Sequence, residues 1–303
     1  MKENQTLLFP RPLQKGDKIA FCSPAGAVKA VYVEEAVEAL GKQGWEAIIM
    51  PHALGKNGHY SGTADERFDD LEKAFTDPDV RAIICSRGGY GAVHLLERLA
   101  RLPLEETPKW LIGFSDISAL HALLTSRGIA SIHAPMAKAL ADHGGDNADN
   151  RALLDFLAGE GLEYSLDPSP MNRPGDATGL LVGGNLSVIS DLVGTPFDVI
   201  KPRRILFIED VNEPIYKIER MLYQLRLSGV LADLAGLIVG KFSGCAPDAD
   251  FASVNNIVAD LTRDYSYPVA YDIPVGHVTH NIPLVCGAAC SLSVGESSVE
   301  ISQ

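Results

Sequence analysis

The sequence predicts an α/β protein in which a parallel sheet is covered by helices. Short apolar runs alternate with amphipathic stretches over most of its 303 residues, which is typical of β-α units. Three of the apolar runs end in turns rich in glycine and serine, at residues 23–26, 86–91 and 113–116. Because the carboxyl ends of parallel strands meet at one edge of a sheet, we expect these turns to open on one rim.

The first half of the chain contains four predicted pairs of strand and helix. The apolar runs predict strands at 18–22, 45–50, 81–85 and 109–113. The 3.6-residue periodicity predicts helices at 33–40, 63–75, 92–99 and from 117 onward. Thr63 followed by Glu66 is the pattern of a capping box, so the second helix should begin at Thr63.

The second half begins after a stretch that lacks periodicity. Residues 159–179 are rich in Gly, Asp, Pro and Ser, and we place the domain boundary there, which gives domains at 1–165 and 176–303. Beyond it, the patterns predict strands at 180–182, 204–208, 237–239 and 269–275, helices at 186–193, 218–227 and 251–265, and a closing hairpin of 289–294 with 298–301.

Composition excludes several classes of partner. A net charge of −13 argues against nucleic acid or an anionic membrane as a partner. The five cysteines have no paired short spacing, so no disulfide framework is expected. The start of the chain lacks the apolar stretch of a signal peptide, and no run approaches about 18 apolar residues. These features favour a cytoplasmic protein.

Ser115 is the first candidate for chemistry. It follows the apolar run 109–113 and precedes a helical pattern, so it is expected on a tight turn at the carboxyl end of a strand. That position resembles a nucleophile elbow, although Ile117 breaks the G-x-S-x-G consensus. A serine before a helix is also an ordinary N-cap, so Ser115 needs partners elsewhere in the chain.

A serine nucleophile requires a base and a group that orients the base. Among the eight histidines, His277 ranks first because it follows a predicted strand directly after a glycine, and His133 remains a candidate. Glu209 and Asp210 end the apolar run 204–208, where a carboxylate either serves the site or caps the next turn. Asp191 and Asp272 are weaker candidates, and the loop residue Glu213 could either bind substrate or face water.

The turn at 86–91 is the other informative stretch. Gly88 and Gly89 allow backbone N–H groups to approach a ligand without a Cβ in the way. The turn fits neither G-x-G-x-x-G nor the phosphate-binding loop, so a nucleotide site is not supported. His277 and His280 lack the spacing of a zinc helix and no C-x-x-C occurs, so no metal site is expected.

Six segments, in this order, resemble the serine LD-carboxypeptidases, a family that includes the microcin C self-immunity hydrolases. They span nearly the whole chain: Ser23-Pro24-Ala25-Gly26, Ser86-Arg87-Gly88-Gly89-Tyr90-Gly91, Gly113-Phe114-Ser115-Asp116, Gly183-Gly184-Asn185-Leu186, Phe207-Ile208-Glu209-Asp210 with Glu213 downstream, and Gly276-His277. One departure is His133-Ala134-Pro135-Met136, where the family has His-Gly-Pro-Met.

The resemblance implies a flavodoxin-like first domain, a smaller swivelling β/α second domain and often a homodimer. It implies a triad of Ser115, Glu209 and His277, which would meet in the cleft between the domains. The oxyanion would be held by backbone N–H groups of Asp116 and of Gly88 or Gly89, and no metal or cofactor would be required. The implied reaction removes terminal D-Ala from murein tetrapeptides in the cytoplasm. The roles of Arg87, Glu213 and His133 stay open.

Three other functions remain in competition. A microcin C-type hydrolase of acyl-sulfamoyl adenylates would need an aromatic platform for the base, and neither Trp45 nor Trp110 offers one. A non-enzymatic binder of small ligands would not react with a serine-directed fluorophosphonate. A nucleotide-dependent oxidoreductase is disfavoured because the glycine fingerprint is missing.

Overall fold

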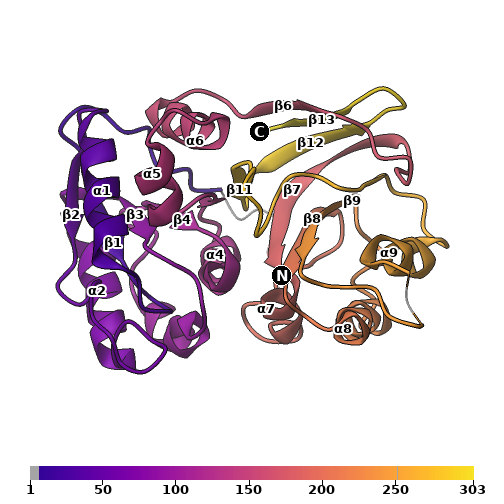
Figure 1. Ribbon diagram of the computed structural model, residues 1–303, viewed down its shortest axis with the longest axis horizontal. Helices are drawn as coiled ribbons and strands as arrows, with labels where there is room; N and C mark the ends of the chain where they lie inside the picture. The colour runs from indigo at the N-terminus through magenta and orange to yellow at the C-terminus, as the bar shows by residue number, and fades with distance from the viewer. Residues whose placement is uncertain (1–6, 251) are drawn as a thin grey trace. The chain divides into compact units, whose positions relative to one another are not determined.

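The computed structural model describes residues 7–250 and 252–303, and the chain divides into two compact units (Figure 1). The first unit ends at Gly161 and takes in Ile282–Val285, and the second comprises Leu162–Asn281 and Cys286–Gln303. The division falls at Gly161 because the next strand, β6 (Glu163–Leu166), pairs within the second unit. The return of residues 282–285 to the first unit has no counterpart in the sequence pattern.

The first unit is built on a six-stranded sheet in the order β2-β1-β3-β4-β5-β11. The strands from β1 to β5 pair in parallel, as expected from the alternating pattern. This is the order of a flavodoxin-like sheet with one strand added at the edge. The strands are β1 (Lys18–Cys22), β2 (Glu46–Ile49), β3 (Val80–Cys85), β4 (Trp110–Gly113), β5 (Ser131–His133) and β11 (Leu284–Cys286).

Helices cover this sheet in two groups. One group has α1 packed on α5, and the other has α3 in contact with both α2 and α4. The capping box at Thr63 is confirmed, since its side chain accepts from Glu66 N and its N–H donates to the Glu66 carboxylate. The helices are α1 (Ala30–Gly41), α2 (Ala64–Thr76), η1 (Ala92–Leu95), α3 (Leu96–Leu99), η2 (Ser115–Ile117), α4 (Ser118–Ser126), α5 (Ala137–His143) and α6 (Ala148–Ala158).

The second unit contains a mixed sheet in the order β10-β9-β8-β7-β12-β13-β6. Strands β7 to β10 run parallel, whereas β12, β13 and β6 are antiparallel. The predicted hairpin at the end of the chain is confirmed as β12 and β13. The strands are β6 (Glu163–Leu166), β7 (Gly175–Asn185), β8 (Arg204–Val211), β9 (Gly236–Ser243), β10 (Val269–Ala270), β12 (Ala289–Val294) and β13 (Val299–Ser302).

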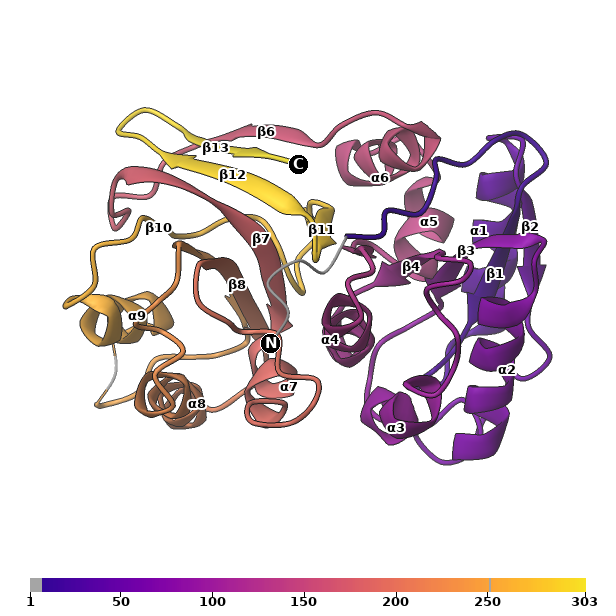
Figure 2. The ribbon, with the colours of Figure 1, turned by 180° about the vertical axis from the view of Figure 1, so that it is seen from behind.

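Helices α7 (Leu186–Asp191), α8 (Ile215–Leu227) and α9 (Val254–Thr262) lie beside one another in chain order (Figure 2). The expected helix over 251–265 begins only at Val254, after the N-cap Ser253, and Phe251 lies outside the described residues.

The expected strand 269–275 is much shorter than predicted. It keeps regular pairing only in β10, because Asp272 adopts φ +64° and turns the chain. Beyond the turn the segment still follows β9, since Ile273 N donates to Val239 O and Lys241 N donates to Val275 O.

Each sheet buries its central strands on both faces, which is why those strands are continuous apolar runs. Phe21 on β1 and Phe207 on β8 are fully buried and mark the centres of the two cores. Within the described residues, no helix is both long and apolar enough to cross a bilayer. Each unit thus has its own buried sheet, and the carboxyl ends of its parallel strands are where polar side chains can form a site.

Candidate active site

Ser115 stands on a strained turn between β4 and α4. Its φ is +66°, a left-handed conformation that non-glycine residues adopt rarely and at a cost of about 1–3 kcal/mol. The strand ends at Gly113, and Ser115 opens the short helix η2 that leads into α4. A half-buried serine on a sharp strand-to-helix turn has the geometry of a nucleophile elbow, although the G-x-S-x-G consensus is absent.

The turn after β3 lies directly against Ser115. A Cβ built on Gly88 would lie 2.7 Å from Ser115 Cβ and 2.8 Å from Ser115 Oγ, so only glycine fits there. Gly26 N donates to Gly88 O at 2.9 Å, which joins the turn after β1 to the same place. The three strand-end turns predicted to share one rim are therefore in contact, and the backbone of Gly88 lies next to the Ser115 hydroxyl.

The side chain of Asp116 points away from solvent and fixes the neighbouring turn. It is only 5% exposed, and its Oδ2 accepts from Ala92 N at 2.7 Å. Burial raises the pKa of this carboxyl, while the Ala92 N–H and the nearby Arg67 charge act in the opposite direction. The carboxylate therefore holds the start of η1 against the serine turn.

His121 supports the same turn from within α4. Its Nε2 lies 2.8 Å from Gly113 O and its Nδ1 lies 2.8 Å from Ser131 Oγ, with the ring fully buried. Because Gly113 O is an acceptor, Nε2 carries the proton and the neutral ring accepts from the serine hydroxyl. Burial lowers the pKa of His121 to about 4, so this histidine stays neutral and structural.

In the second unit, Glu209 and His277 form a hydrogen-bonded pair. His277 Nδ1 lies 2.7 Å from Glu209 Oε2, at the carboxyl end of β8. Glu209 is fully buried, and burial raises its pKa while the bond to His277 lowers it. The His277 side chain keeps 21% of its surface exposed. A buried carboxylate that holds one imidazole nitrogen and leaves the ring accessible is the arrangement of a general base and its orienting group.

Only glycine fits at position 276, where the backbone passes close to the Glu209 carboxylate. Its φ is +121°, and a Cβ on it would lie 2.6 Å from Glu209 Oε2. Ser243 Oγ donates to His277 O at 2.9 Å and Asn281 Oδ1 accepts from Gly276 N at 2.8 Å, so the loop that carries the histidine is fixed on both sides.

Asp210 has a different role from its neighbour Glu209. Its Oδ2 accepts from Ser187 N at 2.9 Å, and its Oδ1 accepts from Asn185 Nδ2 at 3.0 Å. Asp210 therefore caps the start of α7 and organises the turn after β7. Of the two alternatives left open for a carboxylate at this strand end, Asp210 is therefore the cap of the next turn.

The remaining residues that the sequence singled out lie in varied surroundings. Arg87 Nη1 donates to Ala27 O at 2.9 Å, and Glu213 lies 3.7 Å from Lys217 Nζ. His133 is fully buried at the end of β5, with its ring centroid 5.6 Å from that of Phe114. Asp191 is exposed on α7.

An aromatic cluster beside the glycine turn was not anticipated. The ring centroids of Tyr60, Tyr90 and His94 lie 5.3–6.2 Å from one another, and Tyr90 is 58% exposed. Tyr90 belongs to the turn that contains Gly88, the residue whose backbone lies against Ser115. The sequence offered one signal, the tyrosine within Gly89-Tyr90-Gly91, because a large aromatic side chain between glycines cannot be explained by core packing.

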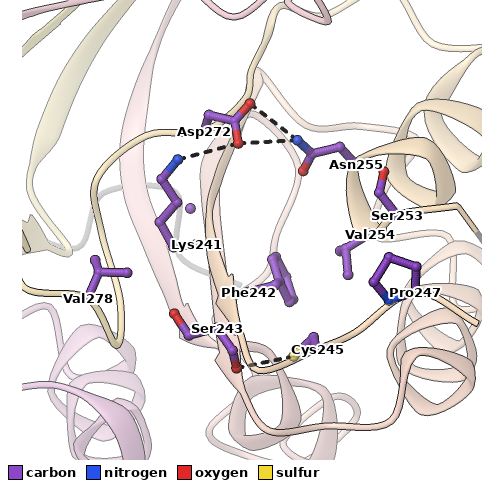
Figure 3. A pocket seen from close by; sticks show the side chains of 11 residues that line it. Lys241, Phe242, Ser243, Cys245, Pro247, Ser253, Val254, Asn255, Asp272 and Val278 are labelled. Atoms are coloured by element: carbon purple, nitrogen blue, oxygen red, sulfur yellow. Dashed lines mark hydrogen bonds and ion pairs between the residues drawn. The ribbon is translucent and has the colours of Figure 1, made fainter.

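A cavity of about 280 Å³ lies in the second unit beside the carboxyl end of β9. Lys241, Asp272 and Asn255 form its polar side, where Lys241 Nζ lies 3.4 Å and Asn255 Nδ2 lies 3.3 Å from Asp272 (Figure 3). Val278, the residue after His277, also lines it. Asp272 thus belongs to this cavity and to the loop anchor at Ser169, whose Oγ donates to it at 2.9 Å.

Among the residues that the structure describes, no three His, Cys, Asp or Glu side chains gather as a metal-binding group. One unit offers a strained serine beside the Gly88 backbone and the other offers a carboxylate–imidazole pair, and both are suited to acid–base chemistry.

Comparison with known proteins connects these two sites to one family. Models of the LD-carboxypeptidase N-terminal and C-terminal domains match residues 19–134 and 178–292. A putative carboxypeptidase of Synechocystis sp. is 36% identical over 293 residues, which cover 95% of each chain. The murein tetrapeptide carboxypeptidase of Pseudomonas aeruginosa is 30% identical over 87% of this chain and 89% of its own.

A solved structure gives the same result. The muramoyltetrapeptide carboxypeptidase from Oxalobacter formigenes superposes with a TM-score of 0.84 at 27% identity, covering 94% of this chain and 98% of that one. The expected family and the two-domain α/β fold are both confirmed. The chain belongs to the LD-carboxypeptidase family and is a hydrolase of that family.

Proposed function

We propose that this protein is a serine LD-carboxypeptidase that removes the terminal D-Ala from murein tetrapeptides, with Ser115 as nucleophile, His277 as base and Glu209 as the group that orients the base. The observation that carries the proposal is the left-handed φ of +66° at Ser115, on a turn where the Gly88 backbone lies against Oγ. Strain of this kind persists at functional sites, and an N-cap does not need it.

The mechanism begins with proton transfer from Ser115 Oγ to His277 Nε2 as Oγ attacks the scissile carbonyl carbon. His277 Nδ1–H donates to Glu209, which fixes the tautomer and stabilises the imidazolium that forms. The imidazolium then gives its proton to the amine of the leaving D-Ala as the C–N bond breaks. Water, deprotonated by the same imidazole, releases the acyl group from Ser115 and restores the enzyme.

The oxyanion of the tetrahedral intermediate is bound by backbone N–H groups of Asp116 and of Gly88 or Gly89. The close approach of Gly88 to Ser115 Oγ supports this role, because an N–H group on this turn needs no side-chain movement to reach the carbonyl oxygen. One donor of this kind in a serine hydrolase is worth about 3–4 kcal/mol of transition-state stabilisation.

The substrate is assigned from the relatives. Two of them carry murein tetrapeptide or muramoyltetrapeptide in their names, and the 30% identity over most of the chain supports the same substrate here. On the family resemblance, we also assign the reaction to murein recycling in the cytoplasm and the active protein to a homodimer.

The decisive experiment is incubation with an L,D-tetrapeptide, followed by mass analysis for the loss of one D-Ala. Wild type should release D-Ala, and Ser115→Ala should be slower by up to about a millionfold if the triad acts as a unit. A serine-reactive fluorophosphonate should label Ser115 in the wild type alone. Near-normal turnover by Ser115→Ala would refute the mechanism.

The aromatic cluster supports a second candidate. Hydrolysis of an acyl-sulfamoyl adenylate requires a surface on which the base can stack, and the exposed ring of Tyr90 offers one beside the serine turn. Parallel assays with the tetrapeptide and the adenylate distinguish the two. If the adenylate is the substrate, its kcat/KM exceeds that of the tetrapeptide, and Tyr90→Ala lowers it without changing tetrapeptide turnover.

A further inference from the structure

Arg67 is a buried arginine on the first turn of α2, far along the chain from the serine turn. Its side chain is only 3% exposed, which is uncommon for arginine unless the guanidinium is fully bonded. Leu71 and Ala74, one and two turns further along the helix, are also fully buried, so Arg67 occupies a core-facing position of the helix. A guanidinium kept at such a position needs a structural or functional reason.

The guanidinium donates to backbone carbonyls from three separate segments. Nη1 donates to Pro24 O at 2.6 Å, after β1, and to Gly91 O at 2.8 Å, after β3. Nε donates to Gly62 O at 3.3 Å, in the loop that follows β2. One side chain therefore ties together the chain after three adjacent parallel strands, β1, β2 and β3.

The other contacts of Arg67 complete a closed arrangement. Nη2 lies 3.3 Å from His94 Nδ1, and the guanidinium carbon lies 4.9 Å from the centroid of the Tyr60 ring. The Asp116 carboxylate attracts the same charge. Since Asp116 accepts from Ala92 N, residues 91 and 92 are held from one side by Arg67 and from the other by Asp116.

A short series of contacts connects Arg67 with Ser115. Residues 91 and 92, which Arg67 and Asp116 hold, end the turn that contains Gly88, and Gly88 lies against Ser115 Oγ. The Pro24 carbonyl belongs to the turn that contains Gly26, whose N–H donates to Gly88 O at 2.9 Å. Two of the contacts that hold the Gly88–Gly89 backbone, one at Gly26 and one at residues 91 and 92, are thus connected to the one guanidinium.

We propose that Arg67 is a positioning residue for the reaction at Ser115: it fixes the turns after β1 and β3 so that the Gly88 and Gly89 N–H groups stay aimed at the oxyanion. The inference rests on the proposed function, because it takes Ser115 as the nucleophile. A donor misplaced by about 1 Å lowers the rate by about a hundredfold.

Lysine cannot replace arginine in this role. The guanidinium presents five N–H donors in a fixed planar fork, whereas an ammonium presents three donors from a single atom. Three carbonyls spread around the fork cannot all be reached from one nitrogen. Arg67→Lys therefore keeps the charge and loses the geometry, which separates electrostatics from positioning.

The test compares Arg67→Met and Arg67→Lys with a matched control, Arg98→Met. Arg98 also makes a cation–π contact, 3.7 Å over Phe68, and an ion pair with Asp65, but it bonds none of the strand-end turns. We expect both Arg67 variants to lose about a hundredfold in kcat on the tetrapeptide with KM changed less than threefold, and Arg98→Met to keep its kcat. Added guanidinium ion should restore part of kcat in Arg67→Ala, which a folding defect would not allow.

Amide hydrogen exchange supplies a readout independent of substrate. Exchange in residues 86–92 should accelerate at least tenfold in the Arg67 variants while exchange in β4 stays unchanged. Unchanged exchange in 86–92, or unchanged kcat in folded Arg67→Lys, overturns the inference. Failure of the wild type to release D-Ala counts against the proposed function instead, and the exchange result still decides the role of Arg67. If Arg67→Met does not fold, Arg67→Lys carries both measurements.

Discussion

Replacing Ser115 by glycine should give a more stable protein than replacing it by alanine. Both changes remove the hydroxyl, but only glycine is relaxed at φ +66°. The left-handed region disfavours a residue with a Cβ by about 1–2 kcal/mol. The greater conformational entropy of glycine in the unfolded chain reduces this advantage of the glycine variant by about 0.5–1 kcal/mol. The glycine variant should therefore be the more stable of the two by about 1 kcal/mol.

The assay is urea unfolding followed by far-UV circular dichroism, with thermal unfolding as a second measurement. For a unit of this size, 1 kcal/mol corresponds to a difference of about 2–4 °C in Tm. The same pair of substitutions at Lys73, an exposed site within α2, serves as the control. There the glycine variant should be less stable than the alanine variant by about 1 kcal/mol, because the site is helical. A Ser115→Gly variant no more stable than Ser115→Ala would show that the turn is unstrained and refute the argument.

Three further outcomes follow from the same geometry. The buried His121 has a pKa of about 4 in the folded state and 6.5 in the unfolded state, so the unfolded chain binds the proton first as the pH falls. The free energy of unfolding should therefore decrease by about 3 kcal/mol between pH 6.5 and pH 4. Urea titrations at each pH measure this dependence, and His121→Asn should make it shallower. Glu209→Gln should keep the fold and lower kcat by about 10⁴-fold, since the amide can stabilise the wrong tautomer of His277; steady-state kinetics near that of the wild type would show that the pair is not catalytic. Gly88→Ala should lower kcat by at least about a hundredfold, because its Cβ would lie 2.8 Å from Ser115 Oγ and one oxyanion donor would be displaced. Gly41→Ala is the kinetic control, because a Cβ there meets no atom within 4 Å and the residue has no positive φ.

Much of the fold was predictable because local periodicity and burial coincide in parallel sheets. The inner strands β1, β3 and β4 are buried on both faces, so each appears as a continuous run, and the turn after each of these runs is marked by glycine or serine. The hairpin of β12 and β13 was predictable for the opposite reason, since one face is exposed and the residues alternate. The predicted strand 269–275 was too long, because apolar composition does not reveal a left-handed residue such as Asp272 in its middle.

The site was predictable to the extent that its residues end strands. Ser115, Glu209 and His277 each follow an apolar run, and a polar side chain in that place has no role in the core. Arg67 and the cluster of Tyr60, Tyr90 and His94 were not found, because their importance lies in contacts between segments far apart in the chain. In the sequence, Arg67 cannot be distinguished from other helical arginines, because its bonds to carbonyls of three loops are visible only in the structure.

The distribution of backbone strain distinguishes a turn from a site. Within the part of the chain that the structure describes, four non-glycine residues have positive φ, and three of them directly follow or lie just beyond parallel strands: Ser115, Asn212 and Asp272. Asn and Asp tolerate the left-handed region because their short side chains bond the local backbone. Serine has much less of that tolerance, so a sharp turn after β4 would be made more stably by Asn or Gly. A hydroxyl in that place, opposite a glycine whose added Cβ would lie 2.8 Å from Ser115 Oγ, is not what the turn alone favours, and this supports the proposal that Ser115 is the nucleophile.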